Sequence, residues 1–132
     1  MAKYAYPAIF TKEDTGYSVE FPDIEGCFTS GENLPDAMEM AEDALCLMLF
    51  DHEEDGEVIP PPSDVKDIQA KTKETVSLIC CDTVEYRKLY DSKAIKKTLT
   101  IPNWLNTLSE KAGINFSSTL QEALMAKLDI RP

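Results

Sequence analysis

The sequence has few of the residues on which metal and redox sites depend. It contains one histidine, His52, and none of its four cysteines stands in a CxxC spacing. A structural zinc site requires a tight cluster of cysteine and histidine ligands, so we expect neither a metal ion nor another cofactor. We expect Cys27, Cys46, Cys80 and Cys81 to be free, partly buried thiols.

Long apolar runs and, in the first half, basic residues are also scarce. No apolar run approaches the ~20 residues that span a bilayer, and the start of the chain lacks a signal-peptide pattern, so we expect a cytoplasmic protein with no membrane partner. Residues 1–70 hold 17 Asp and Glu against 3 Lys and Arg, a net charge of −14, whereas residues 71–132 hold 7 against 10, a net charge of +3. This asymmetry indicates two tasks, because an acidic half attracts basic proteins while a basic half can approach phosphates.

Three short strands are expected at the start of the chain. Residues 4–10 and 17–21 have strand character, and the second of them alternates apolar with polar side chains. The polar turn between them, which contains Gly16, predicts a hairpin. Residues 27–31 predict a third strand.

A long amphipathic helix is expected next. Asn33 is a good N-cap, Asp36 stands three residues later, and Gly56 suits a left-handed C-cap. Acidic residues in the last turn oppose the helix dipole, so we expect that end to fray. The apolar residues 75–81 predict a strand, which gives an α+β domain of order β-β-β-α-β with the helix on one face of the sheet.

The last forty residues have a different pattern, after a mixed, polar stretch at 82–94 that we interpret as a linker. The segment 95–101 alternates, with Ile95, Leu99 and Ile101 on one side and Lys96, Thr98 and Thr100 on the other. Pro102 is expected to open a helix that Gly113 ends, and Asn115 to cap a second helix over 116–128. One strand cannot form a sheet alone, so we expect a two-fold dimer in which the strands of two copies pair.

Two parts of the sequence resemble one known family. The stretches "YPAIF" and "YSVEFPDIEGCFTSG", followed by an acidic helix, resemble the HicB antitoxin family over residues 3–62. Residues 93–130, with "INFSSTLQEAL", resemble the ribbon-helix-helix version of that family. The resemblance implies a partial ribonuclease-H-like domain over residues 1–81, a linker over 82–94, and a ribbon-helix-helix DNA-binding and dimerisation domain over 95–132.

The resemblance also implies partners and site residues. The expected function is that of an antitoxin that neutralises a small, basic HicA-type toxin, an mRNA-cleaving protein, and represses its own operon. Dimers are expected to form through the C-terminal domain and to be able to pair further into tetramers. Lys96, Thr98 and Thr100 would read operator DNA, and Asn115, Phe116 and Ser117 would hold a phosphate. For the toxin, the candidate contacts are the acids Glu20, Asp23, Glu25 and Glu32.

Three other readings remain open. The chain could be a stand-alone ribbon-helix-helix regulator whose N-terminal domain senses a small ligand, or a structural dimer that binds neither partner. A metal-dependent nuclease would need several carboxylates facing one cleft. The first predicted strand has no acid and the second has only Glu20, so we expect no enzyme.

Overall fold

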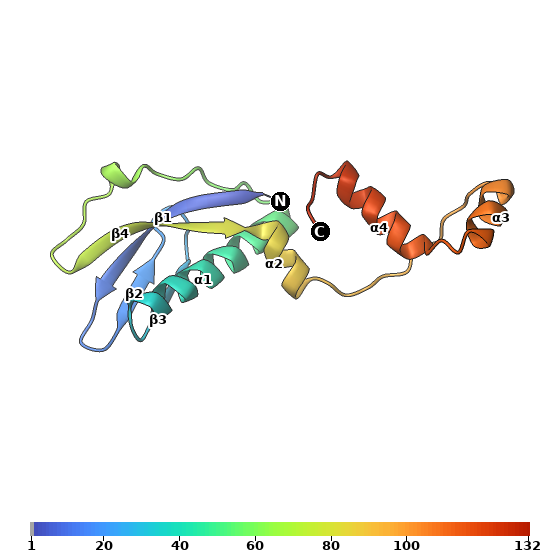
Figure 1. Cartoon of the computed structure of the whole chain (residues 1–132). Helices are drawn as coiled ribbons and strands as arrows, with labels where there is room; N and C mark the ends of the chain where they lie inside the picture. Colours follow the sequence, from blue (N-terminus) through green and yellow to red (C-terminus); the bar gives the residue numbers. More distant parts are fainter. Residues whose placement is uncertain (1) are drawn as a thin grey trace. The chain divides into compact units, whose positions relative to one another are not determined.

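The computed structural model describes residues 2–132, and the chain divides into two compact units, Met1–Lys93 and Ala94–Pro132. We call them the N-terminal unit and the C-terminal unit (Figure 1). The N-terminal unit holds 21 acidic and 8 basic residues, a net charge of −13, and the C-terminal unit holds 3 and 5, a net charge of +2. The charge asymmetry therefore follows the division into units.

The N-terminal unit is built on a four-stranded antiparallel sheet of order β3-β2-β1-β4. Its strands are β1 (Lys3–Lys12), β2 (Tyr17–Glu20), β3 (Phe28–Gly31) and β4 (Glu74–Asp82). The predicted hairpin is confirmed, since Lys12 pairs with Tyr17 at the turn between β1 and β2. The turn requires Gly16, whose φ is 82° and where a Cβ would lie 2.2 Å from the carbonyl oxygen of Gly31. The predicted third and fourth strands are also confirmed.

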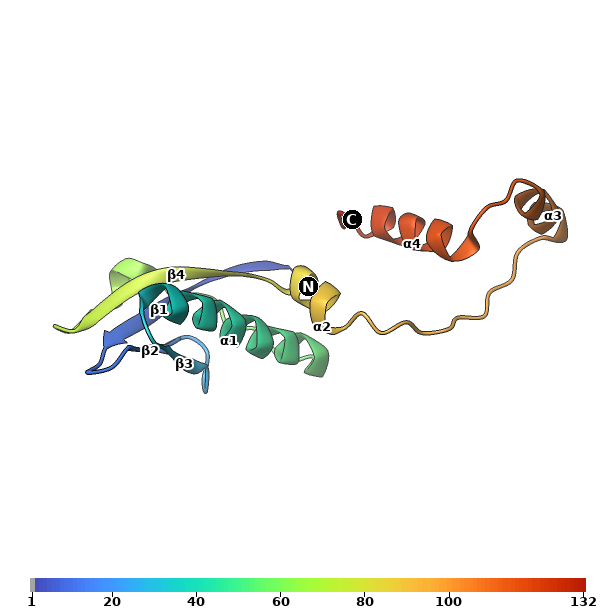
Figure 2. The ribbon, with the colours of Figure 1, turned by 60° about the horizontal axis from the view of Figure 1, so that its bottom comes forward.

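Helix α1 (Leu34–Asp55) lies across one face of this sheet, as predicted (Figure 2). The side-chain oxygen of Asn33 accepts a hydrogen bond from the N–H of Asp36 at 2.9 Å, and the Asp36 carboxylate accepts one from the N–H of Glu32 at 2.8 Å. This reciprocal cap satisfies two donors near the helix start. Gly56 ends the helix with φ 68°, the left-handed conformation expected of a C-cap.

The core lies between α1 and the sheet. The helix contributes Ala37, Ala41, Leu45 and Leu49, each fully buried. The sheet contributes aromatic and aliphatic side chains from β1 and its two neighbours, namely Tyr6, Ala8, Phe10, Val19 and Ile79. Burial of this apolar surface, at roughly 25 cal/mol per Å², gives the N-terminal unit a core of its own.

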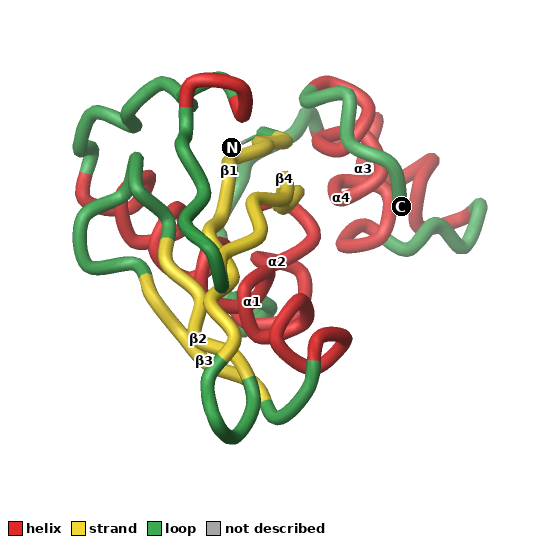
Figure 3. The backbone as a smooth tube through the Cα atoms, turned by 90° about the vertical axis from the view of Figure 1, so that its left-hand side faces the viewer, coloured by secondary structure: helices red, strands yellow, loops and turns green. Residues whose placement is uncertain are grey.

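The connection from α1 to β4 and the segment after β4 complete the unit. Residues 57–73 are loop apart from the short 3₁₀ turn η1 (Val65–Asp67), which contacts β4 (Figure 3). Helix α2 (Thr83–Tyr90) lies within the stretch that the sequence assigns to a linker, and it packs on α1. The Asp82 carboxylate caps it by accepting a hydrogen bond from the N–H of Val84 at 3.0 Å.

The C-terminal unit holds the two predicted helices, α3 (Asn103–Lys111) and α4 (Phe116–Lys127). Pro102 stands at the N-cap of α3, so the helix begins one residue later than predicted. Gly113, with φ 70°, follows the end of the helix. The predicted strand over 95–101 is not formed in the single chain, where this segment carries no regular structure and has no second strand to pair with. Within residues 2–132, no helix is long and apolar enough to cross a bilayer.

Candidate binding surfaces

Three of the four acids predicted to contact a toxin lie at one end of the β2–β3 hairpin. The turn over residues 21–27 is closed by a hydrogen bond of 3.0 Å from the N–H of Phe21 to the carbonyl of Cys27, and it buries Phe21, Ile24 and Cys27. Because the apolar side chains of the turn point inward, Glu25 and the neighbouring Glu20 are exposed. This end of the hairpin also presents Phe28, which pairs with Glu20 and is 72% exposed.

Asp23 and Glu32 differ from the exposed Glu20 and Glu25 in their surroundings. Asp23 is half-buried, and its carboxylate accepts hydrogen bonds from the N–H and the hydroxyl of Ser63, so it anchors the proline-rich loop after α1. Glu32 is exposed but follows Gly31, which pairs with Tyr17 at the opposite end of the hairpin. The structure therefore groups Glu20, Asp23 and Glu25 and separates Glu32 from them.

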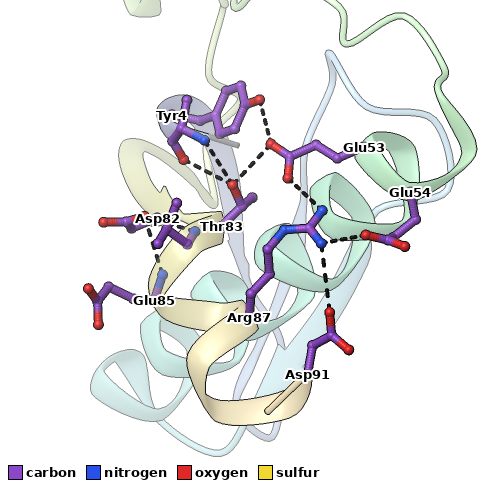
Figure 4. A network of polar contacts seen from close by, with 10 residues as sticks. Tyr4, Glu53, Glu54, Asp82, Thr83, Glu85, Arg87 and Asp91 are labelled. Carbon is purple, nitrogen blue, oxygen red and sulfur yellow. Dashed lines mark hydrogen bonds and ion pairs between the residues drawn. The ribbon is translucent and has the colours of Figure 1, made fainter. Parts of the chain in front are cut away.

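A polar network that the sequence did not predict joins the end of α1 to β1 and α2 (Figure 4). Glu53 is its centre, with a side chain only 7% exposed. Its carboxylate accepts a hydrogen bond from the Tyr4 hydroxyl at 2.8 Å, lies 3.0 Å from the Thr83 hydroxyl, and pairs with the Arg87 guanidinium at 3.1 Å. Arg87 also pairs with Glu54, and its guanidinium lies 4.6 Å from the centre of the Phe50 ring.

This network corrects the expectation that the acidic end of α1 frays. Burial disfavours the charged forms of Glu53 and Arg87, but their hydrogen bonds outweigh it, so the pKa of Glu53 is lowered and that of Arg87 is raised. Burial and the hydrogen bond to Glu53 raise the pKa of Tyr4 to about 12. The acids that oppose the helix dipole are held instead by a cation 34 residues further along the chain.

The residues predicted to contact DNA are all exposed in the C-terminal unit. Lys96, Thr98 and Thr100 lie on the irregular segment before α3. Asn115 caps α4 as predicted, since its side-chain oxygen accepts a hydrogen bond from the N–H of Ser118 at 3.0 Å. Phe116 and Ser117 are the first two residues of α4, and in the described chain their N–H groups donate to no other residue. A helix start of this kind favours anions.

The apolar side chains of the C-terminal unit are left open to solvent in the single chain. None of residues 94–132 is buried. Six large apolar side chains on the two helices are 39% to 68% exposed, namely Trp104, Leu105, Leu108, Phe116, Leu124 and Leu128. Exposed apolar surface on this scale is rare on a monomer and marks an interaction surface.

The N-terminal unit offers no arrangement of ligands for catalysis by a metal ion. Among residues 2–132, no three His, Cys, Asp or Glu side chains are placed to hold a metal ion. His52 lies 3.1 Å from Glu57 through Nδ1 and is partly buried. The geometry that stands out is that of two surfaces, one acidic in the N-terminal unit and one apolar in the C-terminal unit.

Comparisons with known proteins agree with this description. The family model for the HicB-like antitoxin of bacterial toxin–antitoxin systems matches residues 6–129. Antitoxin HicB 2 of Photorhabdus laumondii is 41% identical over 58 residues, which are 44% of this chain and 42% of that protein. The sequence match thus spans less than half of that relative's length.

Solved structures extend the likeness to nearly the whole chain. A chain of the toxin–antitoxin complex from Streptococcus pneumoniae is 33% identical with a TM-score of 0.62, over 95% of this chain and 99% of that one. A chain of the HicA3 and HicB3 toxin–antitoxin complex is 26% identical with a TM-score of 0.51, over 60% of this chain and 99% of that one. Since the family model covers nearly all of the sequence, the chain belongs to the HicB-like antitoxin family of bacterial toxin–antitoxin systems.

Proposed function

We propose that this protein is an antitoxin with two binding tasks, acting in the cytoplasm and without catalysis of its own. Its N-terminal unit binds and neutralises a small, basic, HicA-type toxin that cleaves mRNA. Its C-terminal unit binds operator DNA and so represses the operon that encodes both proteins. The observation that carries this proposal is the division of charge between the units, −13 against +2, in a chain of the HicB-like family.

The toxin-binding task rests on electrostatics. A toxin that binds RNA needs a basic surface. An acidic unit can occupy that surface in place of RNA, and the same negative charge repels RNA. Complementary charge also accelerates association. Glu20 and Glu25, exposed beside the apolar Phe28, combine charge with apolar contact area. We assign to Asp23 a supporting role through Ser63 and to Glu32 a separate contact.

The DNA-binding task rests on the C-terminal unit as a ribbon-helix-helix dimer. Pairing segment 95–101 with the same segment of a second copy would form a two-stranded ribbon that fits the major groove. Lys96, Thr98 and Thr100 would then face the bases, while the N–H groups of Phe116 and Ser117 would hold a phosphate next to the Asn115 cap. One lysine and two threonines discriminate modestly between bases, so part of the specificity would come from DNA shape.

The domain boundaries follow from the same proposal. Residues 1–81 correspond to the partial ribonuclease-H-like domain and residues 95–132 to the ribbon-helix-helix domain, with 82–94 between them. Helix α2 lies in that intermediate stretch and packs on α1, so it extends the first domain and leaves the following residues to connect the two. Pairing of dimers through their N-terminal units would give a tetramer.

Two assays test the proposal. The protein should co-purify with the small basic protein encoded beside it, and the complex should not cleave RNA that the free toxin cleaves. Binding to the DNA upstream of the operon should weaken steeply as salt rises, because lysine–phosphate contacts release counterions. A chain that binds operator DNA but no toxin would instead be a stand-alone regulator, and an operator affinity that is flat with salt would contradict the lysine contacts.

A further inference from the structure

Strand β4, which the 3₁₀ turn η1 contacts, lacks along its outer edge the charges and prolines that normally prevent an edge strand from pairing. β4 ends the order β3-β2-β1-β4 and is nine residues long. Its residues 75–81 contain no charged residue and no proline, Leu78 is 53% exposed, and Cys80 is exposed. Proteins usually protect such edges with charges, prolines or bulges, so an unprotected edge of this length indicates a strand-binding site.

A stripe of carboxylates lies on α1 next to this edge. Glu39, Glu42 and Asp43 share one face of the helix with Cys46, at the spacing i, i+3, i+4 and i+7. With the start of α2 they line a hollow of about 360 Å³ whose other walls include Tyr86, Leu89 and Tyr90. We call Glu39, Glu42 and Asp43 the α1 stripe.

The α1 stripe and the β4 edge adjoin each other. Glu42 and Asp82 line the hollow between α1 and α2, and they also line a second hollow of about 500 Å³ that Cys80 and Cys81 of β4 border. Asp82 is occupied with capping α2. No residue of the described chain forms a hydrogen bond or an ion pair with the side chains of the α1 stripe, whose charge is thus left for a partner.

The wall formed by α2 adds apolar contact area beside these charges. Leu89 is 74% exposed and Tyr90 is 67% exposed. The aliphatic stem of a lysine or arginine packs well on such side chains while its charged end reaches a carboxylate, and an aromatic face also attracts a cation. Carboxylates and exposed apolar side chains together therefore match a basic side chain better than a metal ion.

We propose that the β4 edge binds an extended, positively charged segment of a protein partner, which adds a fifth strand to the sheet and lays its Lys or Arg side chains over the α1 stripe. Strand addition supplies affinity through main-chain hydrogen bonds, and side-chain pockets supply specificity. The inference rests on the proposed function, because the toxin is the basic protein expected to supply this segment. It places the main toxin contact on β4, α1 and α2, away from Glu20 and Glu25 at the end of the β2–β3 hairpin.

A second copy of this chain fits the same edge poorly. Two β4 strands paired about a two-fold axis would place both α1 helices on one face of the joined sheet. The two α1 stripes would then confront each other, and like charges placed opposite are destabilising. Nucleic acid is repelled by the same charges. A basic protein segment is the occupant that the charge favours.

The first test compares two matched sets of neutralising substitutions in the full-length chain. The set Glu39→Gln, Glu42→Gln and Asp43→Asn should weaken toxin binding by at least about 30-fold and lower its salt dependence. The control set Glu13→Gln, Asp14→Asn and Asp55→Asn removes the same charge from exposed positions outside the proposed contacts and should change the affinity by less than about threefold. Circular dichroism and the unfolding midpoint check that both sets are folded.

Substitutions on the two sheet edges test strand addition itself. Leu78→Lys adds a charge to the β4 edge and should weaken binding by about tenfold or more, whereas Ser30→Lys on the opposite edge strand β3 should not. Hydrogen exchange of the complex should show new protection of alternate amides in β4.

The outcomes separate the inference from the proposed function. Strong binding by the wild-type chain that is lost in the control set, or an unchanged exchange pattern in β4, would overturn the inference and leave the antitoxin function in place. Absence of any complex with the wild-type chain would overturn the proposed function, and the inference with it.

Discussion

The two units differ in whether their apolar side chains are buried within the single chain. In the N-terminal unit, α1 and the sheet bury one another's apolar faces, and all buried residues of the described chain lie between Tyr6 and Thr83. In the C-terminal unit, two amphipathic helices leave their apolar faces exposed, and none of its residues is buried. The difference indicates that the first unit folds on its own chain, and under the proposed function the second acquires its core from another copy.

Charge separates the units in the same way. The unit with its own core carries the strong negative charge, and the unit without one carries the positive charge. Under the proposed function, a basic protein binds to a preformed surface, while DNA binding is coupled to dimerisation. A substitution in one unit should therefore leave the binding and the stability of the other unit unchanged.

The largest effect is expected from a charge on the exposed apolar face of α4. Leu124→Asp would bury an unpaired carboxylate in the proposed dimer core, which costs several kcal/mol. The dimer should dissociate and operator binding should fall below detection, while the unfolding midpoint of the N-terminal unit stays unchanged. Gln121→Asp adds the same charge at a polar position of the same helix and serves as control. Sedimentation and a gel-shift assay measure both outcomes, and a stable Leu124→Asp dimer would refute the assigned interface.

A cavity in the core of the N-terminal unit should be nearly as costly. Leu45 is fully buried, so Leu45→Ala is expected to lower the free energy of unfolding of this unit by about 2–5 kcal/mol. Leu47 is 46% exposed on the same helix, and Leu47→Ala should change the free energy of unfolding by no more than about 0.5 kcal/mol. Denaturant unfolding followed by circular dichroism distinguishes the two. Equal effects would mean that α1 does not bury the face described here.

Neutralising the centre of the polar network should have a smaller effect that depends on pH. Glu53→Gln keeps the shape but weakens the bonds to Tyr4 and Arg87, at a cost of about 1–3 kcal/mol near neutral pH. Because the folded-state pKa of Glu53 is lowered, its contribution is complete above the ordinary glutamate pKa of about 4.3 and is lost as the pH falls through the lowered folded value.

The pH dependence supplies the control for that prediction. Unfolding curves of the wild-type protein should show stability declining with acid below the ordinary glutamate range, and Glu53→Gln should reduce that decline. Asp55→Asn, at an exposed acid of the same helix end, should leave it intact. An unchanged acid response in Glu53→Gln would show that the network does not stabilise the end of α1.

The smallest effect is expected at the proposed DNA-reading segment. Lys96→Ala should weaken operator binding evenly across sequences and lower the salt slope by about 1 for each lysine removed. Thr98→Ala should leave the salt slope unchanged and relax the preference at one base position. Fluorescence anisotropy over a salt series measures both. A change in toxin binding by either variant would break the separation of tasks.

Much of the N-terminal unit could be predicted from local sequence. Alternation in residues 17–21 and the turn at Gly16 define the hairpin, and Asn33, Asp36 and Gly56 define the ends of α1, because each signal acts within a few residues. The fold class and the family followed from the same stretches. In the C-terminal unit, Gly113 and Asn115 mark the helix ends for the same reason.

What the sequence did not predict depends on contacts between distant residues. The sequence of helix α2 was interpreted as a polar linker because the residues that stabilise the helix lie on α1, more than thirty residues earlier. There Glu53 and Glu54 pair with Arg87 of α2. The same pairing holds the acidic end of α1, which local electrostatics predicted to fray. Glu32 is close to Glu25 in sequence, but the hairpin places it at the opposite end. The α1 stripe lies on the polar face of an amphipathic helix, and its position beside β4 appears only in the fold.

The central claim is that the preformed N-terminal unit alone neutralises the toxin. A fragment of residues 1–93 contains every buried residue of the described chain, and its inhibition of RNA cleavage by the neighbouring toxin can be measured directly against the full-length chain. We predict a folded fragment that silences cleavage at a one-to-one ratio and binds no operator DNA. A folded fragment that leaves cleavage intact, while the full-length chain abolishes it, would contradict the division of tasks.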